Sequence, residues 1–183
     1  MNWTIPGTTI EASRADADQI ESQFHSMFLA GGLTLSQVSS ITGLEPYAIQ
    51  NWVKRGFLSA PKSKRYNQEQ VCRIITINML KGALSLEKIC GLLQYINGDL
   101  TDESDDIIDD AVLYFMFVKL AARARHIGGN QNWEIALEES IAGYREPVPG
   151  AKERVIKVLR AMLTAWICSR FKAQVDQMVD TLQ

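Results

Sequence analysis

The sequence predicts an all-α protein with at most a tiny β wing. Apolar residues recur at steps of three and four along most of the chain, which is the spacing of one face of a helix. Few segments alternate apolar and polar residues as half-buried strands do, and only 5 prolines interrupt the 183 residues. The composition, 46% hydrophobic and 22% charged, is that of an ordinary globular chain long enough to bury a core.

Residues 1–33 are expected to form an N-terminal arm followed by one helix. The first thirteen residues have no regular period and predict an arm, either ordered or loose. Over residues 16–30 apolar side chains return at helical spacing, and Gly31 and Gly32 end the segment. We expect this helix to pack against the region that follows it.

Two short helices joined by a tight turn are expected between residues 34 and 55. The first begins at Thr34 or Leu35 and breaks at Gly43. Pro46 fits the first turn of the second helix, where its missing N–H costs nothing. Two short helices with a glycine-containing turn between them are the arrangement of a helix-turn-helix.

Residues 59–66 are polar and basic, and they predict a hairpin or wing after the second short helix. Asn67 is a good N-cap for the next helix, and Gln70 can complete its capping box. Ser85 is the expected cap of a further helix.

Residues 99–183 are predicted to form a helical tail domain that serves dimerisation or effector binding. The segment 99–110 carries seven acidic residues in twelve and marks the expected boundary. Its consecutive acids favour a linker and a solvated first helical turn over a metal or catalytic cluster. Helices are expected over residues 104–126, 133–142 and 151–181.

Charge divides the chain in the same way. Between Thr34 and Lys81 there are seven basic and two acidic residues, a net charge of +5. Because the whole chain carries −2, the remainder carries −7. A basic head domain, residues 34–98, and an acidic tail are a mild electrostatic indication of nucleic-acid binding.

Four segments of the head resemble, in order, the DNA-binding domain of the MerR family. Residues 33–44 resemble its opening helix and turn, and residues 49–58 resemble its recognition helix and the exit into the wing. Residues 64–67 (KRYN) are similar to the wing-end signature, and residues 84–93 (LSLEKICGLL) to the helix beyond it. The resemblance implies a winged helix-turn-helix head. The whole chain also resembles a bacterial family catalogued as domain of unknown function number 1836.

The MerR resemblance places a DNA-contacting surface on a recognition helix at residues 46–55 and a wing at residues 59–66. Glutamine and asparagine can pair with adenine in the major groove, and lysine with guanine or a phosphate. Cations on a wing neutralise phosphates and so position a protein without reading sequence. The side chains expected to contact double-stranded DNA are Ser36, Gln37, Tyr47, Gln50, Asn51, Lys54, Arg55, Lys62, Lys64, Arg65 and Tyr66.

Plainer interpretations of the same residues stay open. The polar side of the second short helix and the basic wing could serve solubility alone. Trp52, Phe57 and Tyr66 are better explained as core packing than as base stacking. Aromatic residues of the tail could line an effector pocket, but such stripes are more often core, and no effector ligand is indicated.

The sequence therefore favours a sequence-specific transcriptional regulator. MerR-like proteins pair through a long helix after the head, so the resemblance implies a homodimer through tail helices, with residues 111–122 or 151–181 at the interface. The alternative is a protein–protein interaction module on a MerR-like scaffold with little DNA binding. An enzyme is not expected, because the sequence contains no GxSxG, HExxH, P-loop or GxGxxG motif.

Nothing in the sequence indicates a cofactor or a metal ion. The three cysteines, Cys72, Cys90 and Cys168, are widely spaced in apolar helical patterns, which predicts buried, reduced thiols. The N-terminus lacks the basic and apolar stretches of a signal peptide, and the most apolar segment, residues 111–118, is too short to span a bilayer. A cytoplasmic bacterial protein without membrane contact is expected.

Overall fold

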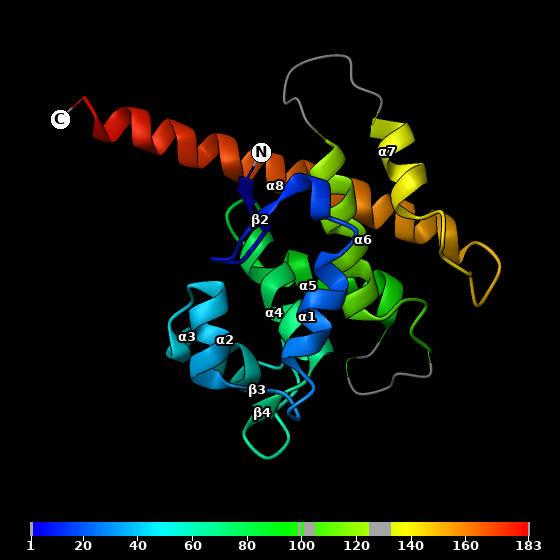
Figure 1. Cartoon of the computed structure of the whole chain (residues 1–183), viewed down its shortest axis with the longest axis horizontal. Coiled ribbons are helices and arrows are strands. Elements are labelled where there is room, and N and C mark those ends of the chain that lie inside the picture. The colour runs from blue at the N-terminus through cyan, green and yellow to red at the C-terminus, as the bar shows by residue number, and fades with distance from the viewer. Residues whose placement is uncertain (1, 99, 101–104, 125–132, 183) are drawn as a thin grey trace.

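The computed structural model describes residues 2–98, 100, 105–124 and 133–182. The predicted all-α class is confirmed, since helices make up most of these residues and the strands form two very short sheets. Figure 1 shows α8 crossing one end of the molecule, with α2, α3 and the β3–β4 sheet grouped at the other. The helices are α1 (Ile20–Met27), α2 (Leu35–Thr42), α3 (Pro46–Lys54), α4 (Gln68–Leu80), α5 (Leu86–Asn97), α6 (Asp110–Arg123), α7 (Trp133–Ser140) and α8 (Ala151–Asp180).

The N-terminal arm contains a hairpin that the sequence pattern did not predict. Strands β1 (Asn2–Thr4) and β2 (Glu11–Ser13) pair antiparallel, so the structure has a second two-stranded sheet besides the expected wing. The arm is fastened to the body, because the hydroxyl of Tyr114 in α6 donates to the carbonyl of Pro6 (2.9 Å). After a short 3-10 turn (Arg14–Asp16), α1 is shorter at both ends than the predicted helix over residues 16–30.

Gly7, in the turn of this hairpin, can only be a glycine. Its φ is +75°, and a Cβ atom there would lie 2.5 Å from the carbonyl oxygen of Ile75. Replacing Gly7 by alanine is expected to lower the free energy of unfolding by about 2–4 kcal/mol, from left-handed strain and overpacking together. Urea denaturation measures the effect. Gly91→Ala is the control, because this helical site has open space and alanine should stabilise it by about 0.5–1 kcal/mol.

Side-chain caps explain where α2, α4, α5 and α6 begin, and the predicted caps at Asn67 and Ser85 are confirmed. Thr34 and Gln37 form a complete capping box at α2, and Asn67 and Gln70 form another at α4. The hydroxyl of Ser85 accepts from the backbone N–H of the third residue of α5.

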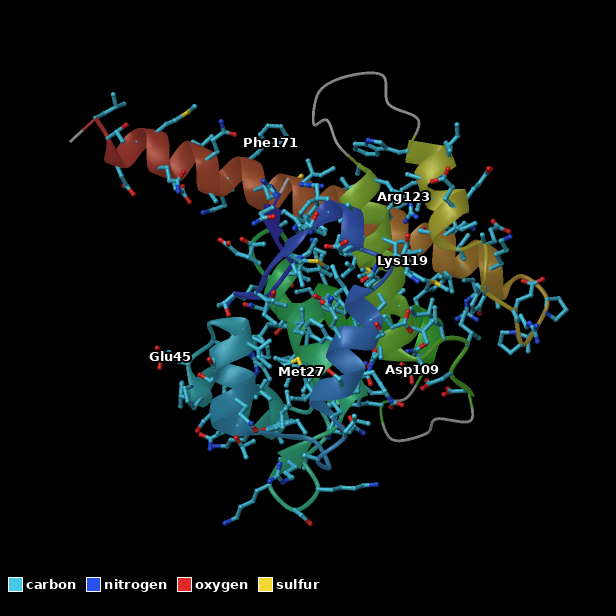
Figure 2. All side chains as sticks on the ribbon, viewed as in Figure 1. Met27, Glu45, Asp109, Lys119, Arg123 and Phe171 are labelled. Atoms are coloured by element: carbon cyan, nitrogen blue, oxygen red, sulfur yellow. The ribbon has the colours of Figure 1, made fainter. Side chains whose placement is uncertain are left out.

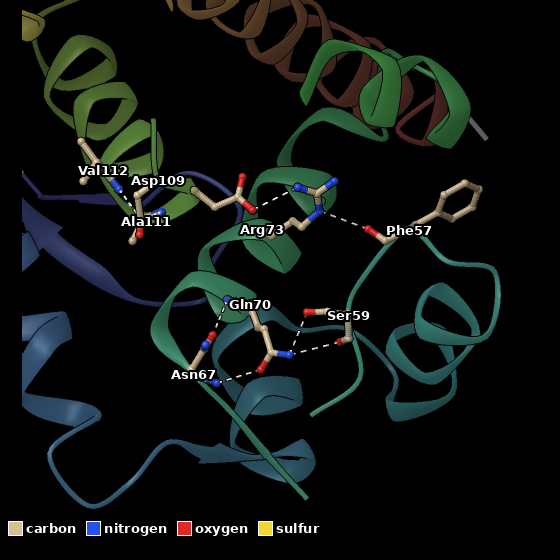
Figure 3. Close-up of polar contacts among 9 residues, drawn as sticks. Phe57, Ser59, Asn67, Gln70, Arg73, Asp109, Ala111 and Val112 are labelled. Carbon is tan, nitrogen blue, oxygen red and sulfur yellow. Dashed lines mark hydrogen bonds and ion pairs between the residues drawn. The ribbon is translucent and has the colours of Figure 1, made fainter. Parts of the chain in front are cut away.

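The predicted helix over residues 104–126 is wrong at its start. Helix α6 begins at Asp110, because the Asp109 carboxylate accepts hydrogen bonds from the backbone N–H groups of Ala111 (2.5 Å) and Val112 (3.2 Å). Figure 3 shows this cap beside the head. The predicted end residues, 104 and 126, lie outside the described residues.

Helix α6 lies at the centre of the core. It packs against α4, α7 and α8, and every residue from 113 to 118 is buried. The aromatic residues Tyr114, Phe115, Phe117 and Trp166 make edge-on or tilted contacts within this core, which supports the packing interpretation over an effector pocket. One continuous cluster of buried residues joins the head helices to the tail helices. The division at residue 98 stays a prediction.

The two halves of α8 have different surroundings. Its first half supplies buried residues such as Val155, Leu159 and Met162 and packs on α4, α5 and α6. Every residue from 170 to 182 is exposed, and this part projects beyond the body. Cys168, just before it, is exposed, so its predicted burial is wrong, whereas Cys72 and Cys90 are buried as expected.

None of the helices in the described part of the chain is both long and apolar enough to cross a membrane.

Candidate nucleic-acid interface

Helices α2 and α3 are joined by a tight, well-supported turn. Helix α2 ends at Gly43, whose φ of +67° and ψ of +11° reverse the chain in the left-handed region that glycine tolerates. Pro46 then occupies the first turn of α3, as predicted. The hydroxyl of Ser39 donates to the carbonyl of Leu44 (2.5 Å) and closes the turn from the side of α2.

Thr9 and Asn78, which the sequence analysis did not identify, also hold this turn in place. The backbone N–H of Thr9 donates to the carbonyl of Ile41 (2.7 Å), and its hydroxyl donates to the carbonyl of Ser40 (2.8 Å). The side-chain amide of Asn78, in α4, donates to the carbonyl of Thr42 (2.9 Å). The N-terminal arm and α4 thus satisfy the last carbonyls of α2, which a helix end otherwise leaves without partners.

Helix α3 presents one polar side to solvent. Its apolar side is anchored in the core by Ile49 and Trp52, which are buried. On the opposite side Tyr47, Gln50 and Lys54 are exposed and Asn51 is half-buried, with Tyr47 the most open at 76%. Gln50, Asn51 and Lys54 follow Tyr47 by three, four and seven residues, so the four side chains form one stripe along the helix.

The segment 59–66, which we call the basic loop, is a hairpin attached to α2. Strand β4 (Arg65–Tyr66) pairs antiparallel with β3 (Leu33–Thr34). At its tip the backbone N–H of Arg65 donates to the carbonyl of Lys62 (2.9 Å), and Ser63 and Lys64 have φ values of +51° and +61°. Two successive positive φ angles are what a tight type I′ hairpin turn requires, and they are uncommon for residues other than glycine, asparagine and aspartate. The side chains of Lys62 and Lys64 are exposed.

Helix α4 fixes the base of the basic loop, as Figure 3 shows. The side-chain amide of Gln70 donates to the carbonyls of Ser59 (3.2 Å) and Ala60 (3.0 Å) and to the Ser59 hydroxyl (2.9 Å). One turn further on, Nε of Arg73 donates to the carbonyl of Phe57 (3.1 Å). The basic loop is therefore held in place by α4, a helix of the core.

Arg73 also joins the head to the tail. Its Nη1 lies 3.0 Å from Oδ2 of Asp110 in α6, and both side chains are largely buried, 6% and 14% exposed. Burial raises the pKa of the Asp110 carboxyl, although the neighbouring Arg73 guanidinium opposes that shift. The sequence analysis considered Arg73 only as part of the positive net charge of residues 34–81. The signal for its role was an arginine inside an apolar helical run, between Cys72 and Ile74.

Three of the predicted contact residues have partners within the protein. Arg55 lies 2.8 Å from the Glu87 carboxylate and its guanidinium stacks over the ring of Phe57. Nη1 of Arg65 donates to the carbonyl of Gly32 (2.8 Å), although the side chain is exposed. The side-chain oxygen of Gln37 accepts from the backbone N–H of Thr34 (2.9 Å) in the capping box. Its neighbour Ser36 is exposed.

Tyr66 is a correction to the predicted set of DNA contacts. The residue is 3% exposed and belongs to the core, where burial raises the pKa of its hydroxyl. Its strand position explains this, because side chains alternate along β4 and exposure of Arg65 directs the next side chain inward. The core interpretation is therefore the right one for Tyr66, and the same holds for the buried Trp52.

The fold and this surface define a class of protein: a helical protein that presents a short exposed helix and a cationic hairpin loop at one end of its body. Within that class the chain belongs to the family described as Domain of unknown function (DUF1836), whose sequence profile matches residues 18–117. The match spans α1 to α5 and the first half of α6, so it contains α3 and the basic loop. The expected membership of this family is confirmed, and the resemblance to MerR domains stays a prediction.

A similar curated protein is "Uncharacterized protein YkrK" of Bacillus subtilis (strain 168), which is 32% identical to this chain over 84 residues. The matched segment makes up 44% of this chain and 36% of that relative, so the chain spans little more than a third of the relative's length. No solved structure matches the chain.

Proposed function

We propose that the protein is a sequence-specific DNA-binding regulator of transcription, with a MerR-like winged helix-turn-helix head. In this proposal α2 and α3 are the helix-turn-helix and the basic loop is the wing. Tyr47, Gln50, Asn51 and Lys54 enter the major groove, where asparagine and glutamine can each make a two-point contact with adenine. Lys62, Lys64 and Arg65 lie against the phosphates beside it.

The observation that supports this proposal most is that the exposed stripe of α3 and the basic loop are both fixed to the core. The exposed stripe of α3 is anchored by Ile49 and Trp52, and the basic loop is tied to α4 by Gln70. A protein that reads base edges must hold its helix in a fixed position relative to the phosphate contacts. Arg73 and Arg55 pair with Asp110 and Glu87, so they add little to the charge that a partner meets. The exposed cations of α3 and the basic loop favour a polyanionic partner at this end of the molecule: Lys54, Lys62, Lys64 and Arg65.

A regulator of this kind would act in the bacterial cytoplasm, where the DNA is, without a cofactor or catalytic residues. We propose that it does so as a homodimer through its tail, since two heads can then occupy the two halves of an inverted repeat.

Selection of duplexes from a random library with the purified full chain tests the proposal. Enrichment of one motif, arranged as an inverted repeat, is the expected result. The wild-type chain should prefer that motif to one in which the contacted adenine is replaced. In the Asn51→Ala variant this difference in binding free energy should be smaller by about 1–3 kcal/mol, because the asparagine side chain supplies the two-point contact. Recovery of the input library without enrichment would contradict sequence-specific binding.

Glu87→Gln is expected to strengthen binding to duplex DNA. The Glu87 carboxylate lies against Arg55, and its removal frees that guanidinium and takes one negative charge from the edge of the surface. We expect a gain of about two- to fivefold at low salt, since one additional cation becomes available to a phosphate. Fluorescence anisotropy with a labelled duplex measures it. Glu153→Gln, which removes a similarly exposed charge paired with Lys157 in α8, should leave the affinity unchanged.

One observation favours the alternative, a protein–protein interaction module on the same scaffold. Tyr47 is a large aromatic side chain that is 76% exposed at the start of α3, and exposed tyrosines are typical anchors of protein interfaces. Under this alternative Tyr47→Ala would abolish capture of a protein partner, and the full chain would not bind a duplex at about 50 mM salt, where electrostatic binding is strong.

A further inference from the structure

A cavity lies where the head meets the tail, away from the exposed stripe of α3. Its volume is about 270 Å³, and its walls are the basic loop, the first turns of α4, the end of α5 and the segment before α6. Figure 2 shows Asp109, which joins this segment to α6, at the end of α6 nearer the basic loop. Ligand pockets in proteins usually measure about 300–1,000 Å³, so this cavity fits a small molecule.

Hydrogen bonds hold the walls of this cavity in place. On one side Gln70 binds Ser59 and so fixes the base of the basic loop (Figure 3). On the other side the backbone N–H of Ile107 donates to the carbonyl of Ile96 (3.1 Å), and the hydroxyl of Tyr144 donates to the carbonyl of Ile107 (2.6 Å). These bonds hold the segment before α6 against the end of α5. The cavity is therefore formed in advance, as ligand sites usually are.

Asn97, the last residue of α5, supplies the atom that indicates a ligand. The residue lines the cavity and is only 6% exposed. Its side-chain oxygen Oδ1 is buried and accepts no hydrogen bond from any described residue. Buried polar atoms are almost always paired, because a bond to water that nothing replaces costs free energy. The cavity therefore contains an acceptor that requires a donor from outside the protein.

The ionisable side chains around the cavity give it a negative net charge. Two are basic and three are acidic, a sum of −1: Lys62 and Arg73 against Glu69, Asp106 and Asp110. The guanidinium of Arg73 is already paired with Asp110. Glu69 and Asp106 also interact within the protein, so the inference depends on Asn97 and on the sum of the charges. An unpaired acceptor in a negative cavity favours a cation that carries N–H donors.

We propose that this cavity binds a small primary alkylamine in its ammonium form. An ammonium group has three N–H donors and one positive charge, so it can donate to Oδ1 of Asn97 and to the carboxylates of the cavity. Leu93, which is buried, and Leu100 provide an apolar wall for the alkyl chain. In the part of the chain that the structure describes, no three acidic, histidine or cysteine side chains are grouped so that they could hold a metal ion. The acceptors are instead spread around the cavity, which suits an organic cation.

A ligand in this cavity would contact both the basic loop and the tail. The walls include Ser59 and Ala60, whose carbonyls accept from Gln70, and Asp110 at the start of α6. A bound alkylamine can therefore act on the position of the basic loop, which would make it an effector of DNA binding. That consequence rests on the proposed function. Binding of the amine does not, so it can be tested without DNA.

Titration of butylamine into the full chain, followed by amide chemical shifts in the absence of DNA, tests the proposal. At pH 7 the amine is protonated, because its pKa is close to that of a lysine side chain. Saturable shifts are expected at residues 59–60, 70 and 93–98, with half-saturation at about 1 mM or below. The tetramethylammonium ion is the matched control. It has the same atomic composition and charge as butylammonium but no N–H donor, so it should bind at least about tenfold more weakly.

Two variants test which atoms hold the amine. Asn97→Leu should abolish the saturable shifts without lowering the melting temperature, because it replaces an unpaired buried carbonyl by an apolar group of similar size. Asp106→Asn should weaken binding by about three- to tenfold. Asp176→Asn, which removes an exposed carboxylate in α8, should leave binding unchanged.

Three results would overturn the proposal: shifts that do not saturate, equal binding of the two cations, or unchanged binding by the Asn97→Leu variant. A buried water would then be the partner of Asn97. None of these results depends on whether the protein binds a duplex, so failure of the amine site and failure of the proposed function are distinguishable.

Discussion

Replacing Arg73 by methionine is expected to lower the free energy of unfolding by about 3–5 kcal/mol. The substitution leaves the carboxylate of Asp110, only 14% exposed, without the guanidinium that lies 3.0 Å away. It also removes the donor to the carbonyl of Phe57, at the base of the basic loop. For a chain of this size the melting temperature should fall by roughly 10 °C, which calorimetry measures directly.

The loss should depend on pH in a defined direction. Burial already raises the pKa of Asp110 above its ordinary 3.8 in the folded protein, and loss of Arg73 raises it further. A carboxyl whose pKa is raised on folding favours the folded state below its unfolded pKa, and that contribution disappears as the pH rises through the folded pKa. The Arg73→Met variant should therefore lose less stability below pH 3.8 than at neutral pH.

Two comparisons identify the buried ion pair as the cause. Arg160→Met breaks an ion pair with Glu134 that is well exposed on both sides, so it should cost less than about 1 kcal/mol. Replacing Arg73 by methionine and Asp110 by leucine together should recover much of the loss, because a buried pair replaced by apolar side chains leaves no unpaired charge. Equal costs for Arg73→Met and Arg160→Met would contradict a structural role of the Arg73–Asp110 pair.

Removing both lysines of the basic loop, with Lys62→Gln and Lys64→Gln, should weaken binding to every duplex by roughly ten- to a hundredfold at low salt. The two side chains are exposed and extend from a hairpin whose base is fixed on α4. Because each phosphate contact contributes about −0.9 to the slope of log K against log salt, the slope should become less steep by nearly two. Sequence preference should be retained, since phosphate contacts carry no sequence information.

The matched control changes the net charge equally at the other end of the molecule. Lys152→Gln and Lys157→Gln remove two exposed cations from α8, which Figure 1 shows far from the basic loop. This pair should leave both the affinity and the salt slope close to those of the wild type. An equal loss in the two double variants would mean that total charge, and not the basic loop, determines binding. Arg65 is less suited to this test, because its bond to the carbonyl of Gly32 also holds the hairpin.

Local chemistry made much of the fold predictable. Each capping box, at Thr34 and at Asn67, depends on two residues three positions apart. Pro46 favours the start of α3, because its ring fixes φ at a helical value. The exposed stripe of α3 follows from helical periodicity in the same way. These features need no knowledge of distant segments, so the sequence alone indicates them.

Features that depend on distant partners were not predictable. The N-terminal hairpin is held by Tyr114 and Asn78, more than seventy residues away in the chain. Several aspartates before α6 are possible caps by sequence, and the structure shows that Asp109 is the one whose carboxylate accepts from the first turn. Within the candidate surface, the contacts of Arg55 with Glu87 and of Arg65 with Gly32 join segments 32 and 33 residues apart. Periodicity predicts which side chains face outward, but it cannot indicate which of them already have partners.

Mapping of amide chemical shifts on adding a duplex tests most directly whether α3 and the basic loop form the DNA-binding surface. The largest changes are expected at residues 47–54 and 59–65, with the projecting end of α8 unaffected, and they should disappear as salt is raised because the contacts are largely to phosphates. Changes confined to the tail helices, or no change at low salt, would contradict the proposal that this end of the molecule binds DNA.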